Sequence, residues 1–347
     1  MTLYPTPQRP QLHHLPATPE TVHWGYFDGA LRPKLTIRSG DIVALETLTH
    51  RAGDAPDLLM DDGVWRVYRE VGERGPGAHI MTGPIAVEGA EPGDTLEVRV
   101  LEMRPRLFYG SNMATRAGLL YEHLGKRQRA TIFEFGANLA LAHARFAFEV
   151  PAVASGPGTI IEPGATQRVP ALPDVAVPLR PHLGVGGVAP DEPGRFSSVP
   201  PGRWGGNIDN WRFGTGTAMY YPVLVAGALY SAGDPHLAQG DGEISGTAIE
   251  ASLNITLQFV LHKDFPLRTQ LLVTPTHWMV HAYHEDLNQA MRQAALEMLH
   301  FLTTHHGLSA EDAYALMSVA ADFTVTQAVD QRQGVHASLA KSVFVAR

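Results

Sequence analysis

The stretch GDPHLAQGDGE, residues 233–243, places three carboxylates and one histidine among glycines. Asp234 and His236 are two residues apart, as are Asp241 and Glu243, so in an extended chain each pair projects onto one face. Hard oxygen donors beside an imidazole suit zinc, manganese or calcium. The stretch therefore predicts either the ligands of a divalent metal or a polar hairpin loop closed by glycines.

Two further clusters carry side chains of the same kinds. In PPGRWGGNIDNW, residues 200–211, a Gly-Gly pair permits backbone conformations closed to other residues and is followed by Asn207 and Asp209. In an extended chain these two side chains would point to the same side. In ETLTHRAGDAPD, residues 46–57, His50 follows a predicted strand and could reach a shared site. The alternatives are an Asx-rich turn for the first cluster and a solvated acidic loop for the second.

Three other histidines resemble metal ligands only in their spacing. His277 and His281 in THWMVHAYH have the i, i+4 spacing of helical zinc ligands, and His284 follows them. The segment has the character of a strand, and no glutamate completes an HExxH motif. We therefore predict that these three histidines are structural.

The composition excludes several classes of function. The chain has 347 residues and no cysteine, so it can form no disulfide, no thiolate zinc site and no cysteine nucleophile. Its net charge of −8 also excludes the positive surface that attracts nucleic acid or anionic membranes. Its apolar runs are too short to span a membrane, and its N-terminus lacks the apolar core of a signal peptide, so we expect a cytoplasmic protein. A GxSxG elbow, a P-loop and a serine–lysine amidase cluster are absent from the sequence.

The elements that must position these side chains are mostly strands. Apolar–polar alternation interrupted by Gly-Asp occurs in residues 34–50 and again in residues 84–103, which is the pattern of β-hairpins. A helical pattern follows near the C-terminus, with apolar positions at Leu287, Met291, Ala294, Ala295, Met298 and Leu302. Gly307 would end this helix, and Ser309 would cap a second one.

We therefore expect a mainly β protein with an α+β portion. It would be an antiparallel β-sandwich or barrel, intertwined with a smaller α/β subdomain that carries the two C-terminal helices. We expect a single unit over residues 1–347, with a β-rich part at 20–180 and the metal-site loops, strands and C-terminal helices at 181–347.

Four segments of the chain, in order, resemble the acetamidase/formamidase family: TGPIAVEGAEPGDTLEV, PHLGVGGVAP, PPGRWGGNIDN and GDPHLAQGDGEISGTAIE. The resemblance implies a β-sandwich, homo-oligomers and a divalent metal, zinc or alternatively calcium. It also implies hydrolysis of a small aliphatic amide to a carboxylate and ammonia. Carried over by motif, it places His50, Asp209, His236 and Asp241 around the metal, with Glu243 beside them.

Metal-activated water is then the expected nucleophile, because the sequence has neither a cysteine nor an evident serine triad. Glu243 is the expected base and proton donor, and Asn207 or a glycine N–H would hold the oxyanion. Two alternatives remain: a hydrolase of another C–N bond, and a non-catalytic binding protein with structural calcium. A catalytic metal keeps an open position, so a coordination count separates catalysis from binding.

Overall fold

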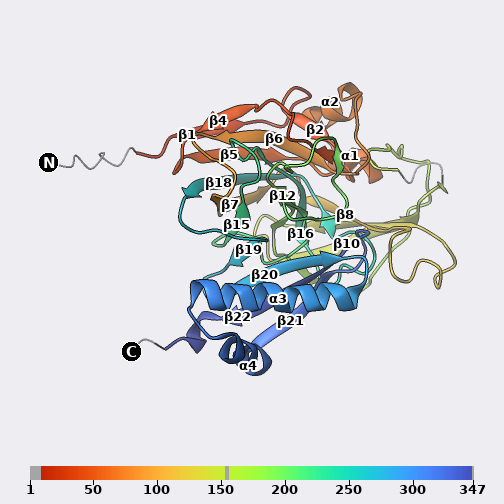
Figure 1. Cartoon of the computed structure of the whole chain (residues 1–347). Helices are drawn as coiled ribbons and strands as arrows, with labels where there is room; N and C mark the ends of the chain where they lie inside the picture. Colours follow the sequence, from red (N-terminus) through yellow and green to blue (C-terminus); the bar gives the residue numbers. More distant parts are fainter. Residues whose placement is uncertain (1–8, 153–155, 346–347) are drawn as a thin grey trace.

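The computed structural model describes residues 9–152 and 156–345, which form two large sheets and one pair of short strands (Figure 1). The first sheet has nine strands in the order β1 (Leu12–Leu15), β5 (Ile42–Thr47), β18 (Leu253–His262), β7 (Thr95–Pro105), β15 (Ala218–Pro222), β19 (Leu271–Val273), β20 (His277–His284), β22 (Gln333–Ala340) and β21 (Ala321–Gln327). Its pairs are antiparallel except β1 with β5.

The second sheet has eleven strands and is branched. Its main path is β11 (Val177–Pro178), β10 (Leu141–Glu149), β9 (Arg129–Phe135), β8 (Tyr109–Ala114), β17 (Ile249–Glu250), β16 (Tyr230–Ala238), β12 (His182–Gly187) and β14 (Gly205–Asn207). The branch consists of β6 (Ile80–Val87), which pairs with β16, and of β2 (Val22–Trp24) and β4 (Leu35–Ile37). The separate pair is β3 (Tyr26–Phe27) with β13 (Phe196–Ser197).

The main core lies between the two large sheets. The nine-stranded sheet contributes Leu45, Val98 and Phe259, and the eleven-stranded sheet contributes Ile85 and Tyr230. In β18 the buried positions alternate with more exposed ones, which is the period-two pattern of a half-buried strand. Both sheets take strands from before and after residue 180, so the two halves of the chain are interleaved.

The two predicted hairpins are wrong, although their strands are present. Within residues 34–50, β4 belongs to the eleven-stranded sheet and β5 to the nine-stranded one, and β6 and β7 are divided in the same way. The Gly-Asp turns therefore carry the chain from one sheet to the other. Alternation fixes which side of a strand is buried, but it does not fix which strand lies beside it.

The two C-terminal helices are confirmed. Helix α3 (Leu287–His305) lies across β20 and β22, and α4 (Ala310–Ala320) follows it (Figure 1). Gly307 has a φ of +68° just beyond the α3 C-cap, and the side chain of Ser309 caps α4 by accepting a hydrogen bond from the Asp312 amide. The buried face of α3 differs from the prediction, since its buried residues are Ala290, Ala294, Met298, Phe301 and Leu302.

Three short helical segments lie near the start of the chain. A 3-10 turn (Ala52–Asp54), α1 (Pro56–Leu59) and α2 (Asp62–Glu70) follow β5, and another 3-10 turn (Lys341–Val343) follows β22.

With 39% strand and 15% helix, the mainly β prediction is confirmed, and neither sheet closes into a barrel within the described residues. None of the described helices is long and apolar enough to cross a membrane.

Candidate active site

A cavity of about 390 Å³ collects imidazoles and carboxylates from both large sheets. The groups come from the loops after β5, β14, β16 and β21, from the residue before β6, and from β16 and β17 themselves. The titratable acidic and imidazole groups that line it are His50, His79, Asp209, Asp234, Glu243, Glu250 and Asp330. The cavity therefore lies where strand ends from distant parts of the chain meet.

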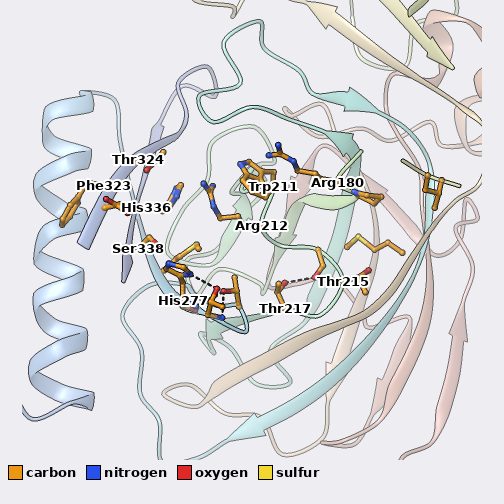
Figure 2. Close-up of a pocket in the computed structure, with 18 residues that line it drawn as sticks. Arg180, Trp211, Arg212, Thr215, Thr217, His277, Phe323, Thr324, His336 and Ser338 are labelled. Carbon is orange, nitrogen blue, oxygen red and sulfur yellow. Dashed lines mark hydrogen bonds between the residues drawn. The ribbon is translucent and has the colours of Figure 1, made fainter. Parts of the chain in front are cut away.

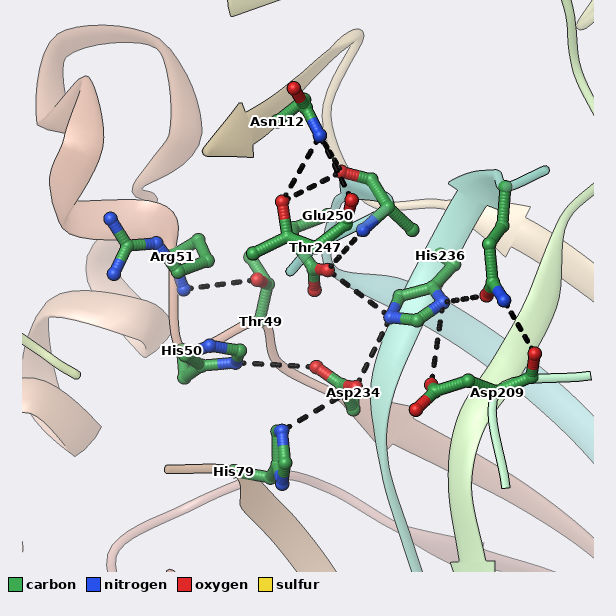
Figure 3. A network of polar contacts seen from close by, with 12 residues as sticks. Thr49, His50, Arg51, His79, Asn112, Asp209, Asp234, His236, Thr247 and Glu250 are labelled. Atoms are coloured by element: carbon green, nitrogen blue, oxygen red, sulfur yellow. Dashed lines mark hydrogen bonds and ion pairs between the residues drawn. The ribbon is translucent and has the colours of Figure 1, made fainter. Parts of the chain in front are cut away.

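Asp234 stands at the centre of this group (Figure 3). Its Oδ1 is 3.2 Å from Nδ1 of His50, and its Oδ2 is 3.1 Å from Nε2 of His236 and 3.7 Å from Nε2 of His79. Burial alone would raise the pKa of Asp234, but the neighbouring His79 and His236 outweigh burial and hold that pKa well below its usual range. Asp234 is therefore a carboxylate surrounded by ring nitrogens.

The ring of His79 is held by Ser198 and points at Asp234. Its Nδ1 lies 3.0 Å from both the carbonyl oxygen and Oγ of Ser198, and its Nε2 lies 3.7 Å from Oδ2 of Asp234. That separation is longer than a hydrogen bond, so a cation bound by Asp234 would also have Nε2 of His79 beside it. Nearby, His50 Nδ1, Asp234 Oδ1 and Glu250 Oε2 are buried and make no well-aligned hydrogen bond among the described residues, although the first two atoms lie 3.2 Å apart. These donor atoms fit a metal ion, and the triad of His50, His79 and Asp234 brings its ligand atoms within 4.8 Å of one another.

His236 is oriented from its opposite side. Nδ1 of His182 donates to the Arg180 carbonyl at 2.6 Å, so Nε2 of His182 is free to accept. Burial lowers the pKa of His182 to about 3, which keeps this ring neutral. Nδ1 of His236 lies 3.1 Å from that Nε2 and also 3.1 Å from Oε1 of Gln239. The proton of His236 on Nδ1 is thereby fixed, and Nε2 is directed at the carboxylates.

Glu250 completes the group on this side. Its Oε1 is 3.2 Å from Nε2 of His236 and accepts a hydrogen bond from the Ala248 amide at 3.1 Å. Burial, with the charge of Asp234 added to it, raises the pKa of Glu250 to about 8. Burial opposes charge on His236, but Glu250 and Asp234 outweigh it and hold the His236 pKa well above its usual value.

A second group of carboxylates faces the same cavity. Ligand atoms of Asp209, His236 and Glu243 lie within 4.8 Å of one another, and the Asp330 carboxyl adjoins that of Asp209. Burial raises the pKa of Asp209 to about 6. Burial, followed by the charges of Asp209 and Asp330, holds the pKa of Glu243 well above its usual range. Burial and mutual repulsion therefore keep at least one proton in this group that exposed carboxylates would release.

Five of the six predicted site residues meet here. His50, Asn207, Asp209 and Glu243 line the cavity, and His236 lies behind it. The Gly-Gly pair before Asn207 has φ values of +96° and +86°, as the sequence suggested.

Asp241 is the predicted metal residue that the structure places elsewhere. Its carboxylate accepts hydrogen bonds from the Arg212 guanidinium at 2.8 and 2.9 Å and from Nε1 of Trp211 at 3.0 Å. Both of these partners line a second, larger cavity of about 950 Å³ (Figure 2). The extended-chain argument fails because Gly242 and Glu243 have φ values of +97° and +45°, which reverse the chain between the two carboxylates. Asp241 is therefore not placed to bind the same metal as His50 and His236, as the resemblance had implied.

The three histidines expected to be structural lie on β20, which is a strand as predicted. His281 is fully buried, with Nδ1 facing the Gln270 carbonyl at 3.3 Å and Nε2 accepting from Nδ2 of Asn210 at 3.0 Å. His277 lines the second cavity, where its Nδ1 lies 2.8 Å from Oγ1 of Thr276, and Nδ1 of His284 accepts a hydrogen bond from the Asp286 amide at 2.9 Å. All three histidines therefore have polar partners within the protein.

Sequence reasoning left four residues of the site unassigned. His79 precedes β6 and belongs to no recognisable motif, and Asp330 lies in the loop between β21 and β22. Asp234 had a signal, because its spacing from His236 placed both on one face. Glu250 stands within the segment that ends GTAIE, but nothing local indicated that it would face His236.

Gly184 on β12 shows how closely the chain approaches the site. A methyl group there would lie 2.6 Å from Oδ1 of Asp209, 2.6 Å from Cε1 of His236 and 2.7 Å from Oδ2 of Asp234. Gly184→Ala should therefore lower the free energy of unfolding by about 1–3 kcal/mol and reduce enzymatic activity. Urea denaturation and an activity assay measure both effects. The control Gly72→Ala, where a methyl group meets nothing within 4 Å, should change neither, and equal behaviour of the two variants would contradict the prediction.

The fold is a β-sandwich, and its candidate active site is a cavity lined by buried carboxylates and imidazoles. The sequence profile of the acetamidase/formamidase family matches residues 27–197 and 192–345. The chain belongs to this family and is an amide hydrolase.

Individual relatives agree with this assignment. The chain is 27% identical over 300 residues to a formamidase of Methylophilus methylotrophus, covering 70% of each chain. It is 28% identical over 301 residues to an acetamidase of Mycolicibacterium smegmatis, covering 69% of this chain and 72% of that one. The solved structure of an acetamidase from Bacillus halodurans superposes with a TM-score of 0.74 at 29% identity, covering 95% of this chain and 98% of that one.

Proposed function

We propose that this protein hydrolyses a small aliphatic amide, of the formamide or acetamide type, to a carboxylate and ammonia in a cation-dependent reaction. The observation that carries the cation dependence is the buried group of His50, His79 and Asp234, whose potential ligand atoms all lie within 4.8 Å of one another. The substrate class follows the formamidase and acetamidase relatives.

The proposed cation ligands are His50, His79, Asp234 and Glu250. The first three form one group of potential ligands, and Asp234 and Glu250 belong to a second group with His236. Of the residues that the resemblance places around the metal, His50 belongs to the proposed set, whereas Asp209 and His236 lie with Glu243 in the adjacent group. Two imidazole nitrogens favour zinc over calcium, which prefers oxygen ligands. When bound, such a cation lowers the pKa of water and polarises a carbonyl oxygen.

Glu243 is the proposed proton carrier. Its carboxyl lines the cavity, and its raised pKa moves it toward the range in which one group can both accept and donate a proton near neutral pH. It would take a proton from the attacking water and deliver it to the leaving nitrogen, so that ammonia leaves rather than an amide anion.

Asn207 is the proposed partner of the substrate carbonyl. Its side chain is 2% exposed, lines the cavity and follows the Gly-Gly turn that holds it there. An amide N–H aimed at the developing oxyanion stabilises the transition state without reorganisation.

Ammonia release from a panel of substrates tests the proposal. The panel contains formamide, acetamide, propionamide, benzamide and a ureide, each assayed with and without a chelator and after zinc or calcium is restored. We expect release from the smallest amides, loss with the chelator, and recovery with zinc. Release from the ureide alone would support hydrolysis of another C–N bond, and activity that is insensitive to the chelator would refute the cation dependence.

The proposal also includes a homo-oligomer that acts in the cytoplasm. The support for an oligomer is limited to apolar side chains on α3 and α4 that a second subunit would cover: Leu296, Tyr314 and Val319 are 56%, 69% and 83% exposed. Sedimentation equilibrium measures the subunit number, and cell fractionation measures the location.

A further inference from the structure

Two buried carboxyl groups in the cavity, those of Asp209 and Asp330, hydrogen-bond to each other. Asp209 is 1% exposed, and apart from this bond neither of its carboxylate oxygens has a hydrogen-bond partner among the described residues. The Asp330 side chain is 9% exposed, and its Oδ2 likewise has no other hydrogen-bond partner among the described residues. The carbonyl oxygen of Asn207, in the same cavity, is also buried without a partner. Buried acceptors without donors point to a ligand that supplies donors.

The loop that carries Asp330 is fixed rather than loose. The Ala328 amide donates to the Gly242 carbonyl at 3.0 Å, and the Gly242 amide donates to the Thr326 carbonyl at 2.9 Å. The loop between β21 and β22 is thereby joined to the turn that carries Glu243.

The same loop is also held from within. Oε1 of Gln327 accepts from the amides of Val329 and Asp330 at 2.9 and 3.0 Å, and its Nε2 donates to the Arg332 carbonyl at 2.7 Å. Gln327 is fully buried. The Asp330 carboxyl is therefore held in place by the fold, as a group that recognises a ligand must be.

The bond between Asp209 and Asp330 takes up one shared proton, so the remaining lone pairs of the two carboxyl groups can only accept hydrogen bonds, and a group that binds beside them must be rich in donors. A primary amide nitrogen carries two N–H bonds, and ammonium carries four, whereas an ester oxygen carries none. The adjacent Glu243 is the proposed source of the proton for the leaving nitrogen, so the nitrogen would lie between these groups during the reaction.

We infer that Asp330, together with Asp209, forms an acceptor-only subsite that binds the amino nitrogen of a primary amide and then the ammonium product. This inference rests on the proposed function and assigns Asp330 a role in specificity. In the overall reaction water forms the new C–O bond, and the C–N bond breaks. Both water protons end on the nitrogen, which gives a carboxylate and ammonium. Asp209 and Asp330 accept N–H bonds throughout and transfer no proton.

Ammonium binding tests the subsite without requiring turnover. Titration calorimetry of the metal-loaded full chain uses ammonium chloride, with tetramethylammonium chloride at equal ionic strength as the probe that lacks N–H bonds. In Asp330→Asn the dissociation constant of ammonium should rise about 10- to 100-fold, which is the range expected for a lost charged hydrogen bond. The dissociation constant of acetate should not change, whereas a general loss of structure would weaken both ligands.

Three comparisons make the test decisive. Asp322→Asn, an exposed carboxylate of β21, is the matched control and should bind ammonium as the wild type does. Asp209→Asn is the second variant: asparagine tolerates the φ of +52° at this position, and the effect should match that of Asp330→Asn. The preference for acetamide over N-methylacetamide, which has one N–H, should shrink in both site variants.

Two results would overturn the inference. One is unchanged ammonium affinity in both Asp330→Asn and Asp209→Asn. The other is the loss of one bound metal equivalent from Asp330→Asn in elemental analysis, because the pair would then be a cation site. If the wild type hydrolyses no amide at all, the proposed function fails, whereas the ammonium titration still decides whether the subsite exists.

Discussion

Asp234→Asn should abolish both cation binding and amide hydrolysis. Asp234 faces three imidazoles, at 3.2, 3.1 and 3.7 Å, and its carboxylate supplies the negative charge at the centre of the proposed ligand set. The neutral amide has the same shape but one oxygen and no charge. We expect cation affinity to fall at least about 100-fold, since even groups outside the ligand set typically contribute 10- to 100-fold.

Elemental analysis after dialysis measures the cation content of this variant, and ammonia release measures its activity. Asp241→Asn is the matched control, because Asp241 belongs to the same segment but is bound by Arg212. The control should keep its cation and nearly all its activity. Full cation content in Asp234→Asn, or loss of the cation in Asp241→Asn, would contradict the ligand set and return Asp241 to it.

Glu243→Gln should abolish turnover while leaving the cation in place. The substitution keeps the size of the side chain and removes its ability to accept and donate a proton. A general acid–base group contributes about 10²- to 10⁴-fold to the rate, so we expect kcat to fall in that range with little change in KM. Steady-state ammonia release, together with elemental analysis, measures both properties.

Glu311→Gln on α4 serves as the control, because Glu311 is an exposed carboxylate in the first turn of that helix. It should behave as the wild type. Full activity in Glu243→Gln would refute the assignment of Glu243, and Glu250, with its pKa raised to about 8, would then be the next group to substitute. Loss of the cation from Glu243→Gln would instead make Glu243 a ligand.

Local sequence patterns predicted the elements of the fold well. Alternation predicted strands such as β5 and β7, and helical spacing with Ser309 as a cap predicted α3 and α4. These predictions succeed because burial of one face imposes a period on the residues of a single element. The pairing of those strands has no such local signal, and the two predicted hairpins were wrong for that reason.

The candidate site divides in the same way. The sequence by itself determined the chemistry available: there is no cysteine, two glycine-rich motifs supply Asn207, Asp209, His236 and Glu243, and the end of a predicted strand supplies His50.

Only the tertiary structure decided which groups meet. His79 and Glu250 are far apart in the chain, yet both face Asp234 or His236, because β6 and β17 both pair with β16. The left-handed turn at Gly242 and Glu243 separated Asp241 from the site, although these residues are close in sequence. A residue's type is local information, whereas the distance between two side chains depends on strand pairing and on turns that the whole fold must satisfy.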